Sequence, residues 1–354
     1  MKIFKEIEFF FQRPKVILVA GNGKKTAKEA ISKVLNRYFK IGKEIVILDT
    51  DAKDAELFLK RSRLPILVAT HIGEYHPDRE FFAGEMDQAL EIEKLAEAIP
   101  AHGFLVLNFD DETIRDIKNK SIAHPLTFGF GSRANVSGTD IVLTQFPSLG
   151  TNFKINNDGN IVPCWLENLF GKENIYAALA AAAVGLALDL NLVEISEALK
   201  GYGGLLGRMK LAKGIKKSLI LDDAESASSL SMLESLRILK QIGETCPEPC
   251  RRVAVLGDIV GIGKYAIEAH EALGEEIKNS ADLLVTVGER AKFFSEGAKS
   301  KGMAEDKIFQ FSDVVSASKF LQSEIKEGDL ILVDGSKEMS MIDIVKEIEI
   351  GPIV

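Results

Sequence analysis

A short glycine turn near the start of the chain combines residue types that can bind a phosphate group. It reads Gly21-Asn22-Gly23-Lys24-Lys25-Thr26. Glycines let backbone N–H groups turn toward phosphate oxygens, and the positive end of a following helix adds to the attraction. In a phosphate loop, a lysine contacts the terminal phosphates and the hydroxyl residue after it holds Mg²⁺. Here Lys25 stands in the place of that hydroxyl residue, and a glycine turn of this kind also occurs with no ligand at all.

The two lysines indicate which ligand the turn would accept. Adjacent cations at a helix N-terminus oppose the helix dipole, and a bound anion would offset that cost. ATP without a metal ion, or another phosphorylated ligand, would suit Lys24 and Lys25. The alternative is that Lys24 is a solvated lysine at the start of a helix.

Acidic residues at the ends of apolar runs form a second group of candidates. Asp222 and Asp223 end the run "SLILDD", and ligands of α/β sheets gather at the carboxyl ends of strands. We therefore expect these two carboxylates to face a ligand. Asp110 and Asp111 follow the run "FLVLNF", where an aspartate can instead cap the start of a helix.

The three cysteines do not form a metal-binding pattern. Cys246 and Cys250 lie in "CPEPC", and Cys164 stands alone. A zinc site would need a second pair of ligands at a suitable spacing. We therefore expect a rigid loop with incidental thiols.

Alternating strands and helices must position these candidate residues. In the first half, the apolar runs at 16–20, 44–48, 65–70 and 104–109 are typical of buried parallel strands. Helical stretches at 26–38 and 86–99 lie between them. This alternation predicts an α/β sheet that is covered on both faces.

The second half repeats the alternation after a change of character. Residues 128–161 are short alternating segments with an Asn-Asp-Gly turn, which predicts a small antiparallel sheet. The glycine-rich segment "KGYGGLLGRMK" then indicates a domain boundary. We expect an N-terminal extension at 1–14, a first domain at 15–204 and a second α/β domain at 205–354.

Composition limits the classes of function. The 354 residues carry a net charge of −8, which argues against a general nucleic-acid-binding protein. No apolar run is long enough to span a membrane, and the first residues lack the apolar region of a signal peptide. We therefore expect a cytoplasmic protein.

Seven segments along the chain resemble the Mur ligase family, and they occur in the same order as in that family. Within the family they are most similar to the member that acts last in the synthesis of peptidoglycan precursors. They are "VLNFDDE", "TFGFG", "GKENIYAALAAAAVGLAL", "LLGRMK", "LDDAESASSLSMLESL", "RRVAVLGDIVGIGKYAIEAHEALG" and "ILVDGSKEMSMIDIV". The resemblance covers nearly the whole chain. It implies a central P-loop-type α/β domain with a small antiparallel sheet, followed by a Rossmann-like C-terminal domain. The family's first domain, which binds the UDP-sugar, has no counterpart before Lys15, so UDP-sugar specificity would need another chain.

The resemblance also implies a chemistry and a set of roles. In this family ATP phosphorylates a carboxylate of a peptidoglycan precursor, and an amine then attacks the acyl phosphate to form an amide. The enzyme positions the substrates and neutralises phosphate charge. The family roles that fall on this chain are phosphate binding at Gly21, Asn22, Gly23, Lys24, Lys25 and Thr26, nucleotide binding at Asn174, Arg208 and Asp223, metal binding at Asp49 and His76, and further matched positions at His270, Ser336 and Lys337.

Several family positions hold a different residue here. Ile92 stands where the family has a carbamylated lysine, and Ala177 replaces an asparagine at the adenine. Glu173 replaces a histidine, residues 224–229 lose the family pattern, and Asp334 replaces a lysine. The resemblance thus leaves two hypotheses: an ATP-dependent amide ligase, or a non-catalytic relative that binds a nucleotide or a partner Mur ligase. ATP is the expected cofactor, whereas Lys25 argues against Mg²⁺, because an ammonium group cannot ligate a metal and repels it.

Overall fold

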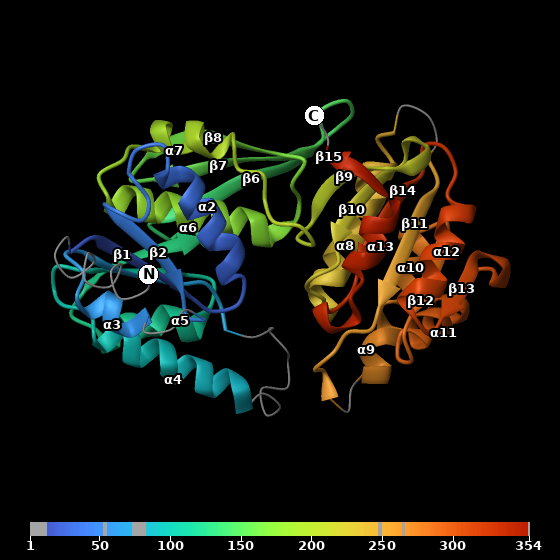
Figure 1. Ribbon diagram of the computed structural model, residues 1–354, viewed down its shortest axis with the longest axis horizontal. Coiled ribbons are helices and arrows are strands. Elements are labelled where there is room, and N and C mark those ends of the chain that lie inside the picture. Colours follow the sequence, from blue (N-terminus) through green and yellow to red (C-terminus); the bar gives the residue numbers. More distant parts are fainter. Residues whose placement is uncertain (1–12, 52–54, 73–82, 247–249, 264–265, 353–354) are drawn as a thin grey trace, which may run out of the picture. The chain divides into compact units, whose positions relative to one another are not determined.

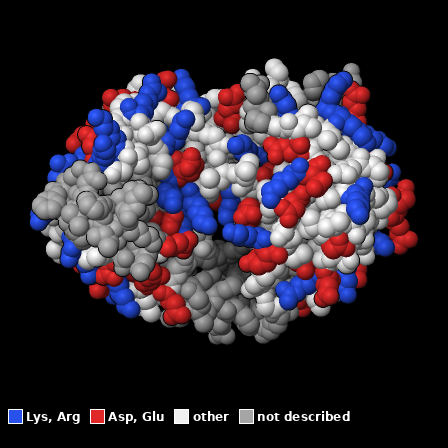
Figure 2. All heavy atoms as spheres, viewed as in Figure 1, with Lys and Arg blue, Asp and Glu red and all other residues white. Residues whose placement is uncertain are grey.

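The computed structural model describes residues 13–51, 55–72, 83–246, 250–263 and 266–352, which form two units (Figure 1). The first unit comprises the described residues of Met1–Val142, Asn152–Leu166 and Lys172–Gly203. The second comprises those of Leu143–Thr151, Glu167–Gly171 and Gly204–Val354. Each unit is built on its own sheet. Basic and acidic side chains are interspersed on the face that Figure 2 shows.

The sheet of the first unit has eight strands in the order β2-β1-β3-β4-β5-β6-β7-β8. Their bounds are Lys15–Ala20 (β1), Ile45–Asp49 (β2), Pro65–Ala69 (β3), Phe104–Asn108 (β4), His124–Gly129 (β5), Val136–Thr144 (β6), Gly150–Asn157 (β7) and Asn160–Glu167 (β8). Strands β1 to β5 pair in parallel, which confirms the predicted parallel sheet. Asp158 and Gly159, both with positive φ, form the two-residue turn between β7 and β8.

Helices cover both faces of this sheet. They are α2 (Lys24–Leu35), α3 (Ala55–Lys60), α4 (Ala83–Glu97), α5 (Glu112–Asp116), α6 (Gly171–Ala187) and α7 (Leu192–Leu199). One apolar cluster joins β1, β3 and β4 to α3, α4 and α5, while α2, α6 and α7 lie on the other side (Figure 1). The alanines at 178 and 180–183 of α6 are fully buried, so their small side chains allow close packing. The β1 and β3 strands are buried on both faces, which explains their continuous apolar sequences.

The sheet of the second unit has seven strands in the order β13-β12-β11-β14-β10-β9-β15. Their bounds are Lys210–Gly214 (β9), Leu219–Asp223 (β10), Arg252–Gly257 (β11), Leu283–Val287 (β12), Ile308–Phe311 (β13), Leu330–Asp334 (β14) and Glu349–Pro352 (β15). The five strands from β13 to β10 pair in parallel, and β9 is antiparallel to both of its neighbours. A parallel sheet with crossover helices confirms the expected Rossmann-like architecture.

Two apolar clusters cover the two faces of this second sheet. The helices are α8 (Ser229–Gly243), α9 (Ala266–Ala272), α10 (Gly274–Ser280), α11 (Lys292–Ser300), α12 (Val314–Glu324) and α13 (Ile342–Ile348). Helices α8, α10 and α11 contribute to one cluster, and α12 and α13 contribute to the other. Burial of large apolar side chains on both faces supplies most of the stability of such a layer.

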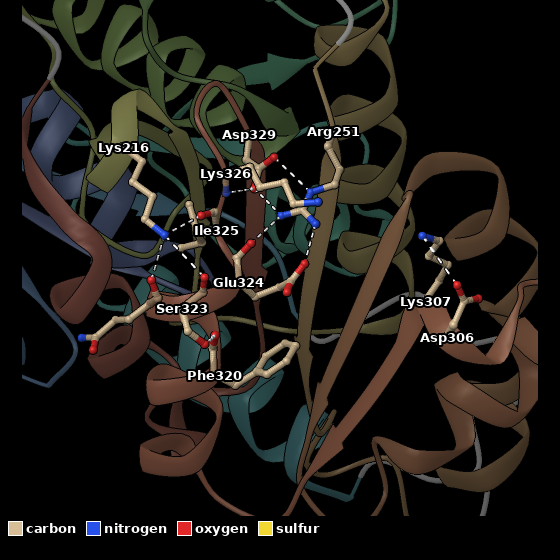
Figure 3. Close-up of polar contacts among 11 residues, drawn as sticks. Lys216, Arg251, Asp306, Lys307, Phe320, Ser323, Glu324, Ile325, Lys326 and Asp329 are labelled. Atoms are coloured by element: carbon tan, nitrogen blue, oxygen red, sulfur yellow. Dashed lines mark hydrogen bonds and ion pairs between the residues drawn. The ribbon is translucent and has the colours of Figure 1, made fainter.

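An ion-pair network anchors the start of β11 in the second unit (Figure 3). The Arg251 guanidinium donates to both carboxylate oxygens of Asp329, at 3.1 and 2.7 Å, and to Glu324 at 2.7 Å. The bond to Asp329 raises the pKa of Arg251 above its usual value. Nearby, the Lys216 ammonium donates to the carbonyl oxygen of Ile325 at 2.7 Å. These bonds fix the chain on the side of the sheet where its parallel strands begin, so we assign them a structural role.

The cysteine prediction was wrong in one respect. Cys246 and Cys250 are joined by a disulfide, so these thiols are not incidental. Their Cα atoms lie 6.2 Å apart, a separation that a disulfide bridges, because the end of α8 and the start of β11 meet there. Cys164 is buried as a free thiol, and burial raises its pKa to about 12.

Among the residues that the structure describes, we find no helix with the length and apolar character needed to cross a membrane.

Candidate functional site

The glycine turn forms a very short connection between β1 and α2. Three residues separate Ala20, the last of the strand, from Lys24, the first of the helix. Gly21 has φ 96°, and a Cβ atom there would lie 2.5 Å from the Thr70 Oγ1 atom. Gly23, at the N-cap of α2, has φ 74°. Both positions therefore require glycine, for lack of space at Gly21 and for the left-handed conformation at both.

Residues after β3 hold this turn in place. The Asn22 backbone N–H donates to the His71 carbonyl oxygen at 2.7 Å. The Thr70 hydroxyl contacts the Ala20 carbonyl oxygen at 2.9 Å and also the Asn22 carbonyl oxygen. Sequence reasoning missed Thr70 and His71; the available signal was their position at the carboxyl end of a strand next to β1. One N–H group of the turn is thus already paired within the protein.

Lys24, the expected phosphate lysine, binds two residues that follow β2. Its ammonium group donates to the Thr50 hydroxyl at 2.9 Å and to the Asp51 carboxylate at 2.7 Å. The hydrogen bond from Lys24 lowers the pKa of Asp51, and the charges of Lys25 and Lys28 add to this effect. Lys25 itself is exposed. The structure therefore brings an acidic residue to the lysine that sequence analysis assigned to phosphate.

Asp49, an expected metal ligand, lies at the end of β2 and is 7% exposed. The Lys28 ammonium binds its carboxylate Oδ2 atom, and its Oδ1 atom accepts from the Asp51 backbone N–H at 3.2 Å. The other expected ligand, His76, lies outside the described residues. In the part of the chain that the structure describes, no three His, Cys, Asp or Glu residues are grouped in a way that could hold a metal ion.

Thr26 has the hydroxyl group closest in sequence to the expected metal position. It is 1% exposed, and its hydroxyl donates to the carboxylate of Glu173 in α6. The Glu173 side chain also lies next to Gly23, 3.6 Å from where a Cβ atom would be. A carboxylate from a distant segment therefore lies against the phosphate turn, and sequence analysis gave no sign of that contact.

Asn174 is fully buried in the first turn of α6. It accepts a hydrogen bond from the Tyr202 hydroxyl at 3.2 Å, and burial raises the pKa of Tyr202. Ala177, one turn further along, is 2% exposed. The expected adenine-binding segment thus has a buried amide that binds a neighbouring side chain of its own unit.

Asp110 and Asp111 play different roles. Asp111 caps α5, because its side chain accepts from the Ile114 N–H at 3.1 Å. Asp110 instead accepts from the N–H groups of Phe130 and Gly131, at 2.6 and 2.9 Å. The Tyr176 hydroxyl adds a third bond to Asp110, at 3.0 Å. Capping was therefore the right interpretation for Asp111, while Asp110 fixes the loop after β5.

In the second unit, Asp222 and Asp223 bind the backbone of the segment before β9. Asp222 accepts from the Gly207 N–H at 2.6 Å, and Asp223 accepts from the Met209 N–H at 3.2 Å. Burial raises the pKa of Asp222 to about 6, although the backbone hydrogen bonds from Gly207 and Ala224 oppose the rise. Arg208 therefore lies between two residues that the carboxylates hold.

Asp334 ends β14 beside Asp223, its register partner in β10. It is fully buried, and among the described residues neither of its carboxylate oxygens has a hydrogen-bond partner. The nearby Ser235 hydroxyl lies 2.9 Å from Asp223 and 2.8 Å from the Ser231 carbonyl oxygen, so its single proton is already engaged. Burial raises the pKa of Asp334, and the charge of Asp222 adds to the rise.

His270 is fully buried in α9 and has two backbone partners. Its Nε2 atom accepts from the Ile259 N–H at 3.1 Å, and its Nδ1 atom contacts the Ala266 carbonyl oxygen. This pattern requires a neutral ring, and burial lowers the pKa of His270 accordingly. The arrangement accounts for His270 as a structural residue.

Ser336 and Lys337 follow β14. The Ser336 hydroxyl is buried and accepts from the Val260 N–H at 2.8 Å. The Lys337 side chain is 63% exposed, and its ammonium lies 3.8 Å from the Glu225 carboxylate. Ser336 thus joins two loops at the carboxyl edge of the sheet, whereas Lys337 reaches into solvent.

Two family models match this chain. "Mur ligase middle domain" matches residues 56–185, and "Mur ligase, glutamate ligase domain" matches residues 207–337. The first match includes most of the sheet of the first unit, and the second begins just before β9.

Curated relatives are ligases of peptidoglycan precursors. The chain is 26% identical to the UDP-N-acetylmuramoyl-tripeptide–D-alanyl-D-alanine ligase of Bacillus subtilis, over 96% of this chain and 77% of that protein. It is also 26% identical to the UDP-N-acetylmuramate–L-alanine ligase of Desulfotalea psychrophila, over 83% of this chain and 62% of that protein. The chain thus spans about three fifths to three quarters of these relatives.

Solved structures share the fold. MurF from Acinetobacter baumannii matches with a TM-score of 0.77 and 22% identity, covering 97% of this chain and 78% of that one. MurF ligase from Thermotoga maritima, solved in complex with ADP, matches with a TM-score of 0.73 and 18% identity, covering 98% and 82%. At identities of 18% and 22%, these matches establish a shared fold.

Proposed function

Since the chain belongs to the Mur ligase family, we propose that it binds a nucleotide or another phosphate ligand at its glycine turn, with ligase activity that is impaired or lost. By descent it would be an ADP-forming carboxylate–amine ligase of peptidoglycan precursor synthesis. The family uses ATP and Mg²⁺ for that reaction. The site fits ATP and Mg²⁺ unequally, because the residues at the glycine turn fit a phosphate whereas the residues at the expected metal position do not fit Mg²⁺.

The proposal that ligase activity is impaired rests on the loss of a metal-binding hydroxyl group at the start of α2. Lys25 places an ammonium group where a metal-binding hydroxyl is expected, and an ammonium group cannot ligate Mg²⁺. Thr26, the next residue, donates its hydroxyl proton to Glu173. Asp49 is engaged with Lys28. These contacts do not fit a resident Mg²⁺, so no step of the proposal depends on the metal.

Phosphate binding is supported by the turn itself. Gly21 and Gly23 have the backbone conformations that let N–H groups face an anion, and α2 begins directly behind them. Lys24 is close enough to the turn to contact a terminal phosphate once it leaves Asp51. The Thermotoga maritima relative was solved with ADP, which makes an adenine nucleotide the first ligand to test.

The alternative is that the chain retains ligase activity. The match to the Bacillus subtilis ligase extends over 96% of this chain, which favours a shared reaction by descent. In either case we expect the protein to act in the cytoplasm, where ATP is available. A partner Mur ligase or another cell-wall protein is the expected macromolecular partner.

Calorimetry with ATP, with and without Mg²⁺, separates the two hypotheses. We expect ATP binding that Lys24→Met abolishes and that Mg²⁺ does not strengthen. A second assay measures ADP release after a UDP-muramoyl peptide and D-alanyl-D-alanine are added. Mg²⁺-dependent binding together with ADP release would contradict impaired catalysis. Absence of any Lys24-dependent binding would contradict a phosphate site.

A further inference from the structure

The lysine expected to contact phosphate already has an anionic partner within the chain. The Lys24 ammonium lies 2.7 Å from the Asp51 carboxylate and 2.9 Å from the Thr50 hydroxyl. A carboxylate and a hydroxyl oxygen offer the same kind of acceptor as the oxygens of a terminal phosphate. Both partners follow β2, the strand next to β1, so the sheet itself brings them to the turn.

Two further carboxylates lie near the start of α2. Lys28 binds Asp49, and the carboxylate of Glu173 lies beside Gly23 and accepts from the Thr26 hydroxyl. Internal carboxylates thus approach the start of α2 from two separate segments. A phosphate at the turn would therefore lie close to the Glu173 carboxylate as well as to the lysines.

We infer that Asp51 competes with the phosphate ligand for Lys24, so that the free protein holds its phosphate site in a self-inhibited state. The inference rests on the proposed function, because it assigns the phosphate to Lys24. The ligand class is a terminal phosphate or diphosphate, as in a nucleotide or inorganic pyrophosphate. Binding requires the Lys24 ammonium to exchange the Asp51 carboxylate for a phosphate oxygen.

The exposure of the pair makes this exchange feasible. The Asp51 side chain is 60% exposed and the Lys24 side chain 20% exposed. Water therefore screens the ion pair, and such pairs change an equilibrium constant by about fivefold at most. A diphosphate carries more charge than one carboxylate, and it can also accept bonds from backbone N–H groups. The contact would thus weaken phosphate binding without preventing it.

A double-mutant cycle with inorganic pyrophosphate tests the competition. Affinities are measured by calorimetry at low ionic strength for the wild type, Asp51→Asn, Lys24→Met and the double variant. Asp140→Asn is the matched control, because Asp140 is 61% exposed and pairs with Lys154 at 2.8 Å. Circular dichroism melting curves establish that each variant is folded.

We expect Asp51→Asn to bind pyrophosphate about fivefold more tightly than the wild type, whereas Asp140→Asn changes the affinity less than twofold. In the Lys24→Met background, the effect of Asp51→Asn should fall below twofold, because the competition acts through Lys24. The competition is overturned if Asp51→Asn gives no gain while Lys24→Met still weakens binding. If Lys24→Met changes nothing in either background, the phosphate site of the proposed function fails together with it.

Discussion

Asp334→Asn is expected to stabilise the protein, and to do so increasingly as the pH rises. Asp334 is fully buried, and its carboxylate oxygens lack hydrogen-bond partners among the described residues. Burial raises its pKa above the ordinary value of 3.8. The folded state therefore binds the proton more tightly than the unfolded state. Stability falls as the pH rises from 3.8 toward the folded pKa, and it levels off above that value.

The size of the effect follows from the proton that the folded chain must retain. If Asp334 stays protonated in the folded protein at pH 7, folding must hold a proton that the unfolded chain releases near pH 3.8. At about 1.4 kcal/mol per pH unit, that costs about 4 kcal/mol at most. The neutral carboxyl and the asparagine amide have nearly the same size and are both uncharged, so the cost of burying the polar group largely cancels between the two proteins. We expect a gain of about 2 to 4 kcal/mol at pH 7 and about 1 kcal/mol or less at pH 4.5.

Urea unfolding of both proteins at several pH values measures this gain. Circular dichroism follows the whole chain, and the fluorescence of Trp165, its single tryptophan, follows the first unit separately. Asp306→Asn is the control, because that carboxylate is 74% exposed and should give no pH-dependent difference. A gain that does not change with pH would refute the reasoning. So would a loss of stability at pH 7, which would mean that Asp334 is ionised and that a cation neutralises it.

Three further predictions concern the turn and the buried histidine. Lys25→Thr should restore a metal-binding hydroxyl. Calorimetry of this variant should then show ATP binding that is about threefold or more tighter with Mg²⁺ than without Mg²⁺. Gly21→Ala should cost about 1 to 3 kcal/mol in urea unfolding, because its φ of 96° and the nearby Thr70 hydroxyl leave no place for a methyl group. Because the pKa of His270 is lowered, stability should fall as the pH drops below 6.5, and His270→Gln should remove that part of the pH profile.

The fold could be predicted in detail because its signals are local. Strand β1 is one continuous apolar run, and the residues that follow it change to helical spacing. The turn at Asp158 and Gly159 was marked by its residue types. Element boundaries were less accurate. The helix expected at 26–38 spans Lys24–Leu35, since periodicity does not fix helix ends.

The partners of the candidate site residues could not be predicted. Thr26 and Glu173 are separated by 147 positions, yet their side chains form a hydrogen bond. Asp222 and Asp223 end β10, as the apolar run predicted, but nothing in the sequence indicated that both carboxylates accept bonds from nearby backbone N–H groups. The disulfide between Cys246 and Cys250 depended on where α8 ends relative to β11. Long-range geometry, rather than residue type, decided each of these contacts.

The sequence by itself determined the alternation of strands and helices, the glycine turn with its two lysines, and the replacement of the metal-binding hydroxyl by Lys25. These features depend on residue type and short spacing, which the sequence states directly. Only the tertiary structure decided that Asp51 binds Lys24, that Glu173 lies against the turn and that Asp334 is fully buried at the end of β14. The physical reason is that the charge state of a site depends on every group the fold places within a few ångströms, and those groups come from distant strands and helices.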